Sequence, residues 1–219
     1  MEDLNFLATC IVGCVDLPEK YRRFLLSLLD GLPTPYSVVK EAAGKLPTLS
    51  QALSIIAQRI GAKSIFEREV VEMYFLSTEN NLPPSTAREI LKAIGVKEET
   101  ITLVPRSLEI KPLHNCIVFL SAFPVFSEAI NLCSVRPAVA IARITENAVK
   151  LRTIFVAQKG EEFCLQEREE YARTFVPLEK GDLVAIHYGY VIRRITENEN
   201  ETFCKGLSLI PLLFNKRSS

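Results

Sequence analysis

The chain has 219 residues, of which 48% are hydrophobic, and its 26 basic and 26 acidic residues leave no net charge. This length suits one large domain or two small ones, and the hydrophobic content is sufficient for a packed core. The charge balance argues against a protein whose main task is to neutralise nucleic-acid phosphates, and no segment reaches the ~18–20 apolar residues of a membrane-spanning helix. The apolar N-terminal segment follows Glu2 and Asp3 instead of basic residues, which favours a buried helix over a secretion signal. We therefore expect a cytoplasmic protein whose six cysteines stay reduced.

Residues 1–110 are predicted to form a helical domain. Apolar residues recur at helical spacing in the segment 19–31, and Gly31 is a typical residue for ending that helix. Further helices are predicted at 36–45, 48–61, 62–76 and 85–95, and the one at 48–61 is expected to start in a capping box at Thr48. Residues 54–72 have the length of a helix-turn-helix, but Glu67, Glu69 and Glu72 would face DNA phosphates, which disfavours DNA binding.

The hydrophobic pattern of residues 111–219 differs from the helical spacing of residues 1–110. Residues 111–132 are predicted to be an apolar connector that contains a strand, because the segment HNCIVFLSAFPVF, 114–126, is strongly apolar and β-prone. Residues 133–219 are predicted to be a small β-barrel with a helical tail, since short strands alternate with turns from residue 135 onward. Strands are expected at 135–144, 148–156, 163–165, 171–177 and 183–195, with Gly189 interrupting the last of them. The predicted fold class is α+β.

Two stretches of this C-terminal part resemble the HypC/HupF hydrogenase maturation chaperones. CSVRPAVAIARITENAVKL, 133–151, resembles the family's opening Cys-x-x-x-Pro-Gly and its first hairpin, with Ala138 in place of the glycine. GDLVAIHYGYVIRRITENE, 181–199, resembles the family's Gly-Asp-x-Val-x-x-His-x-Gly-x-x-Ile run. The resemblance covers under a third of the chain and places the cysteine far from the N-terminus, whereas in the family it follows the initiator methionine. It implies an OB-like barrel and a role in assembling the iron centre of nickel–iron hydrogenases.

Cys133 and His187 are the candidate metal ligands. A thiolate and a neutral imidazole suit borderline metals such as iron or zinc, and two protein ligands leave positions for a partner or an exogenous ligand. The other motif residues are structural: Pro137 is expected to set the turn into the barrel, Gly181 to lie in a turn and Gly189 to supply a bend. Asp182 is a weak candidate for orienting the histidine, because it lies five residues away along the strand.

Other pairs of possible ligands are predicted to be packing residues. Cys10 and Cys14 could share a helical face, and His114 and Cys116 a strand face, but both pairs have apolar surroundings. A cysteine–histidine catalytic dyad lacks a third member, so an enzymatic role is disfavoured. The leading hypothesis is a metallochaperone-like accessory protein that carries iron to a protein partner, such as a hydrogenase precursor or another maturation protein. The alternative is a protein-binding module that uses the barrel without a metal.

Overall fold

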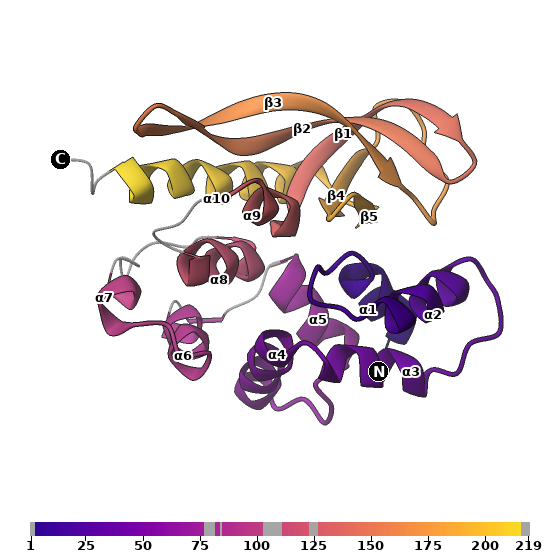
Figure 1. Cartoon of the computed structure of the whole chain (residues 1–219), viewed down its shortest axis with the longest axis horizontal. Helices are drawn as coiled ribbons and strands as arrows, with labels where there is room; N and C mark the ends of the chain where they lie inside the picture. The colour runs from indigo at the N-terminus through magenta and orange to yellow at the C-terminus, as the bar shows by residue number, and fades with distance from the viewer. Residues whose placement is uncertain (1–2, 77–81, 84, 103–110, 123–126, 216–219) are drawn as a thin grey trace.

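The computed structural model describes residues 3–76, 82–83, 85–102, 111–122 and 127–215. Figure 1 shows a sheet on one side of the molecule with helix α10 against it, and most of the helices on the other side. Helices α8 and α9 lie between these two layers. The α+β class predicted from the sequence is confirmed.

The first helices follow the apolar periodicity of the sequence. They are α1 (Leu4–Ile11), α2 (Glu19–Leu29), α3 (Ser37–Gly44), α4 (Pro47–Ile60), α5 (Arg68–Phe75), α6 (Ser85–Ala93) and α7 (Glu98–Ile101). The capping box expected at Thr48 is wrong, because α4 already starts at Pro47, a residue that suits the first position of a helix. The helix expected at 62–76 is shorter than predicted, since the Glu67 carboxylate accepts hydrogen bonds from the backbone N–H groups of Lys63 and Ser64 and holds a turn there.

The strand expected within 114–126 is wrong. Residues Leu113–Ala122 form helix α8, and residues 123–126 lie outside the described part of the chain. Seven of the ten residues of α8 are buried, so the helix is apolar nearly all round and carries no clear stripe. Periodicity alone does not separate such a helix from a buried strand. Helix α9 (Glu128–Cys133) follows and leads into the sheet.

Five strands form a mixed sheet whose pairing order closes on itself. The strands are β1 (Arg136–Thr145), β2 (Ala148–Lys159), β3 (Glu162–Arg173), β4 (Leu183–His187) and β5 (Tyr190–Arg194), and the order is β1-β2-β3-β5-β4. Antiparallel pairing of β4 with β1 completes the circuit, while β3 meets β5 only at Arg173 and Tyr190. Two short segments were predicted where the structure has one long β3, because its alternating charged residues do not look like a buried strand. Gly189, with a φ of 76°, separates β4 from β5 as expected.

The turn before β4 contains two of the predicted motif residues. Gly181 has a φ of 97°, and its N–H donates to the carbonyl of Ala140 in β1. The Asp182 carboxylate accepts a hydrogen bond from the backbone N–H of Glu179 and pairs with Arg194 at 2.9 Å. Pro137 lies in β1 opposite Ala185, and its carbonyl accepts a hydrogen bond from the Thr153 hydroxyl. Gly181 and Asp182 therefore hold the turn into β4, whereas Pro137 lies within β1 and not in the turn that was expected there.

Three asparagine side chains attach helices to the sheet, because each hydrogen-bonds to both the N–H and the carbonyl of one residue in a strand or directly before one. Asn115 of α8 accepts from the N–H of Val135 at 2.7 Å and donates to its carbonyl at 2.8 Å. In the same way Asn131 of α9 binds both backbone groups of Val156, and Asn215 of α10 (Glu197–Asn215) binds those of Phe163. A buried backbone group without a partner is costly, so each side chain satisfies two such groups and fixes a helix to the sheet.

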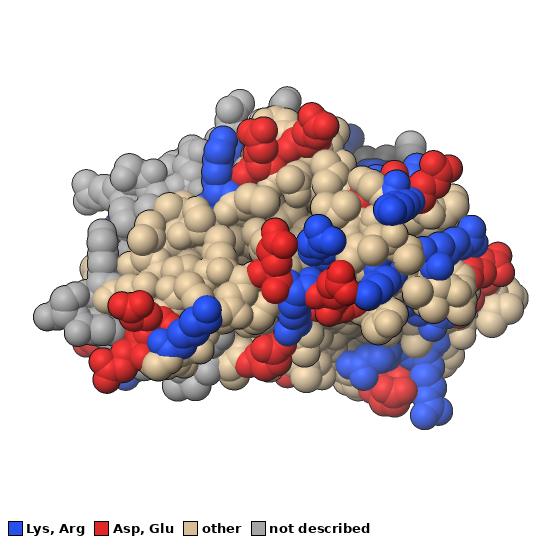
Figure 2. Space-filling view, turned by 90° about the horizontal axis from the view of Figure 1, so that it is seen from above, with Lys and Arg blue, Asp and Glu red and all other residues tan. Residues whose placement is uncertain are grey.

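Buried apolar residues from the helices and from the sheet form one shared cluster, and a smaller second cluster consists of residues from the sheet and its connecting turn. On the face seen in Figure 2, basic and acidic side chains are interspersed. Cross-strand ion pairs such as Lys150–Glu169 contribute to this pattern. Within the described part of the chain, no helix is both long and apolar enough to cross a membrane.

Candidate metal site

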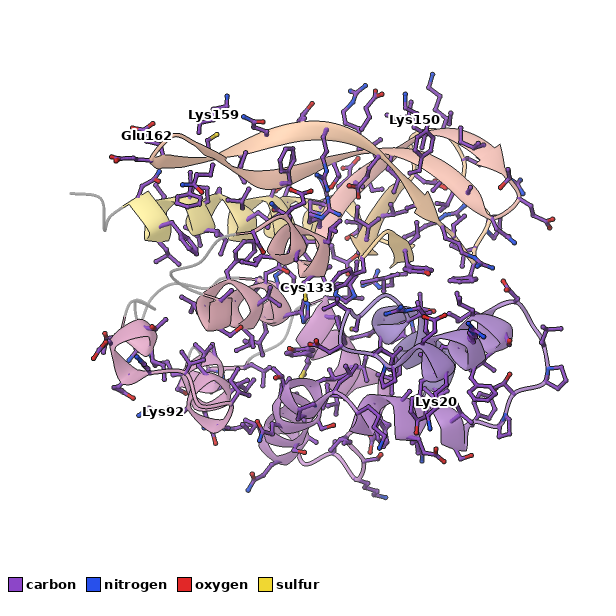
Figure 3. The ribbon with its side chains drawn as sticks, viewed as in Figure 1. Lys20, Lys92, Cys133, Lys150, Lys159 and Glu162 are labelled. Atoms are coloured by element: carbon purple, nitrogen blue, oxygen red, sulfur yellow. The ribbon has the colours of Figure 1, made fainter. Side chains whose placement is uncertain are left out.

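Three side chains from three elements converge where the helical layer meets the sheet. Cys133 is the last residue of α9, His114 lies in the first turn of α8, and His187 ends β4. Each offers one ligand atom, and these atoms lie within 4.8 Å of one another. Both histidines are buried, and Cys133 is partly buried. Figure 3 shows Cys133 at this junction of helices and strands.

Backbone contacts explain why the three residues meet. The clamp between Asn115 and Val135 holds the start of α8 beside the residues that follow Cys133. The N–H of Tyr188 donates to the carbonyl of Leu132 at 2.8 Å, which ties the end of β4 to the end of α9. Tyr188 has a φ of 49°, a strained value for a tyrosine, and strain of this kind often marks functional sites. These backbone contacts keep the cysteine and both histidines adjacent.

His187 is held in a metal-binding tautomer. Its Nδ1 lies 2.8 Å from the carbonyl of Cys10 in α1, so the proton belongs on Nδ1. The lone pair is then on Nε2, a buried atom without a hydrogen-bond partner among the described residues. A histidine ligand is typically oriented in this way by a carbonyl on its other nitrogen. The Cys10 carbonyl therefore has the orienting role considered for Asp182, which binds Glu179 and Arg194 instead.

His114 is connected to Cys133 through two contacts. Its Nε2 lies 2.7 Å from the Cys133 carbonyl and 4.0 Å from the Cys133 sulfur. Nδ1 of His114 is buried and has no hydrogen-bond partner in the described structure. The imidazole ring packs edge-on against His187, with ring centroids 5.0 Å apart, and against Tyr74 at the same distance. Since Nε2 is the nitrogen placed beside the sulfur, a metal that bound both would displace the contact between Nε2 and the Cys133 carbonyl.

Burial keeps all three groups neutral. It lowers the pKa of His187 to about 4, although the nearby Cys10 and Cys133 carbonyls oppose the shift. Burial and the second imidazole lower the pKa of His114 to about 3. Burial also raises the pKa of the Cys133 thiol to about 11, against the opposing effect of the nearby Tyr188 hydroxyl. Neutral imidazoles are ready to bind a cation, whereas the thiol must first lose its proton.

A cavity of about 510 Å³ reaches this site from the side of the helices. Its lining includes His114 and Cys133 of the site, together with Cys14, Tyr74 and Tyr188. Val15 and Asp16, which also border it, are exposed to solvent. The cysteine and one histidine can therefore be reached by a small molecule or an ion.

The structure brings together the two predicted ligands, Cys133 and His187, and adds His114, which the sequence had indicated to be a packing residue. His114 was overlooked because its neighbours are apolar and its segment looked like a strand. The only other histidine of the chain was already a candidate, and this scarcity was the available signal. Cys116, paired with His114 in the sequence, is buried on α8 and is not part of the group, and burial raises its pKa to about 12. Searches against family models, curated proteins and solved structures found no match to this chain.

Proposed function

We propose that the chain binds a borderline metal ion, iron in the first instance, through Cys133, His187 and His114. The proposal depends on one observation: a thiol and two imidazoles from three separate elements lie within 4.8 Å of one another. Ligand atoms on one tetrahedral ion are about 3.3–3.8 Å apart, given metal–ligand bonds of ~2.0–2.3 Å. The widest separation therefore needs to contract by up to roughly 1 Å before all three groups can bind one ion.

The proposed role is that of a non-enzymatic accessory protein that holds the metal for another protein. Three protein ligands leave a coordination position for an exogenous ligand or for a partner's side chain. Because the Cys133 thiol is protonated in the free protein, metal binding releases a proton and becomes tighter as the pH rises. Protonation of the Cys133 sulfur would lower the affinity for the metal and so favour its transfer to a partner.

Hydrogenase maturation is the narrower form of this proposal. A closed five-stranded sheet with a cysteine just before β1 and a histidine at the end of β4 is compatible with an OB-like barrel of the HypC/HupF kind. The partner would then be a hydrogenase precursor or a second maturation protein. In this chain the cysteine follows a helix instead of a chain terminus, so His114 and the helical layer enclose the metal where that family has a free end.

Anaerobic loading with ferrous iron tests the proposal. The wild-type chain and a Cys204→Ala control should each retain about one iron per chain after desalting, because Cys204 lies on α10 and outside the three-residue group. The Cys133→Ala and His187→Ala variants should lose most of it. Cobalt in place of iron should give a thiolate-to-metal charge-transfer band that disappears in Cys133→Ala. Equal iron content in wild type and Cys133→Ala would refute the ligand role.

The alternative is a protein-binding module in which the three groups only pack. It is favoured by the hydrogen bond that already joins His114 to the Cys133 carbonyl and by the aromatic rings of Tyr74 and Phe75 around the histidine. The same loading experiment separates the two functions, since a packing cluster retains no iron and gives no charge-transfer band.

A further inference from the structure

The cavity beside the metal site is larger than an ion requires. Its volume of about 510 Å³ lies within the range of sites for organic small molecules. Apolar side chains supply most of its wall, including Leu46, Leu49, Phe75, Ile117 and Ile130. These residues come from α4, the segment before it, α5, α8 and α9, so four helices enclose the space. A pocket with this lining gains most from an apolar ligand.

Part of the polar lining belongs to the three-residue site or lies beside it. Cys133, His114 and Tyr188 border the cavity, and the Tyr74 ring, which also borders it, is 5.0 Å from His114. No lysine or arginine borders the cavity among the described residues, and Asp16 is its charged residue. An anionic ligand would meet this carboxylate without a compensating cation.

We propose that this cavity binds an uncharged, mostly apolar organic molecule whose hydrogen-bonding group lies beside Cys133 and Tyr188. The inference goes beyond metal binding, because the apolar wall and the charge at the entrance are present without an ion. Bound there, the molecule would cover the accessible side of the three-residue site and control its contact with solvent and with a partner.

Two fluorescent probes with the same skeleton test the charge and the shape of the cavity. N-phenyl-1-naphthylamine is neutral, and 8-anilino-1-naphthalenesulfonate adds one negative charge. The metal-free full-length protein should bind the neutral probe at a single saturable site and the sulfonate on the order of tenfold more weakly. Asp16→Lys should reduce this preference. Equal or tighter binding of the sulfonate by the wild-type protein would overturn the inference.

Cavity-filling variants locate the binding site. Ala129→Phe and Ser121→Phe start from exposed positions on α9 and α8 at the cavity, so each should fold and weaken the neutral probe severalfold. Ala93→Phe is the matched control, because Ala93 is exposed at the end of α6 and does not border the cavity. Unchanged probe binding in both filling variants would contradict the inference.

The Cys133→Ala variant separates this inference from the proposed function. It should still bind the neutral probe, since the apolar wall is intact, while it loses iron. In the wild-type protein, absence of iron binding together with retained probe binding would remove only the metal proposal. Retained iron with no probe binding would remove only the cavity proposal.

Discussion

The two buried histidines predict an unusually simple dependence of stability on pH. In the folded chain the pKa is about 3 for His114 and about 4 for His187, whereas in the unfolded chain both are expected near 6.5. Below pH 6.5 the unfolded state therefore binds protons that the folded state does not. The contribution of the two histidines to the free energy of unfolding is therefore fully present above about pH 6.5. It is lost as the pH falls towards their pKa values in the folded chain.

The effect on stability is large because both histidines of the chain have a strongly lowered pKa in the folded state. Between pH 7 and pH 5 each should lower the free energy of unfolding by about 2 kcal/mol, and the pair by about 4 kcal/mol. Ion-paired carboxylates contribute mainly at lower pH. Glu169, for example, has a pKa lowered from 4.5 by Lys150, so its contribution is lost mostly below pH 5. The interval from pH 7 to pH 5 thus reports on the histidines.

Urea unfolding of the metal-free protein, with chelator and reductant present, measures the effect. A loss of about 4 kcal/mol should shift the midpoint downward by roughly 1–2 M for a chain of this size. A His187→Gln variant, even if less stable, should show about half the change between the two pH values. A midpoint that stays constant from pH 7 to pH 5 in the wild-type protein would show that the imidazoles are not buried as neutral groups. Bound metal should make the dependence steeper, because the metal-bound folded chain cannot take up these protons and metal binding itself weakens as the pH falls.

Two further predictions concern the contacts that hold the layers together. Asn115→Ala should lower the free energy of unfolding by about 2–4 kcal/mol, because it leaves two buried backbone groups without partners, and Asn215→Ala by only ~1 kcal/mol, because its contacts are partly open to water. Gly206→Ala should lower the free energy of unfolding by more than about 2 kcal/mol, because the new Cβ would lie 1.6 Å from the Lys111 carbonyl oxygen. Gly44 is also helical but has no neighbour within 4 Å of such a Cβ, so Gly44→Ala should be neutral or stabilising by up to ~1 kcal/mol. Urea midpoints of the four variants check both; equal costs within either pair would contradict the assigned contact.

The sequence predicted the parts of the fold that depend on local pattern. Period-two alternation located β1 and β2, and apolar spacing located α2 and α4. It failed at α8 and β3, where the pattern is set by tertiary surroundings: α8 is buried on nearly all sides, and β3 carries charges because much of it faces solvent. No local signal in the sequence distinguishes a buried helix such as α8 from a strand, or a charged strand such as β3 from a loop.

The candidate site was predictable only in part for the same reason. Cys133 and His187 could be identified from the sequence because each lies in a stretch that resembles a motif of a known family. His114 contributes through a contact between α8 and the end of α9, and the Cys10 carbonyl through a contact between α1 and β4. A backbone carbonyl has no sequence signature at all. Long-range packing thus supplied both the third ligand and the group that orients the second.

The freedom of the three side chains determines how a metal would enter. His187 is fixed by the bond from Nδ1 to the Cys10 carbonyl, and His114 lies beside the clamp of Asn115 on Val135. Cys133 has a single side-chain torsion, is only partly buried and borders the cavity. The sulfur therefore has the most freedom to move towards a metal, while Nε2 of His114 would have to give up its contact with the Cys133 carbonyl. Since the same sulfur would have to lose its proton before it binds a cation, Cys133 would determine both the position of one ligand and the pH dependence of binding.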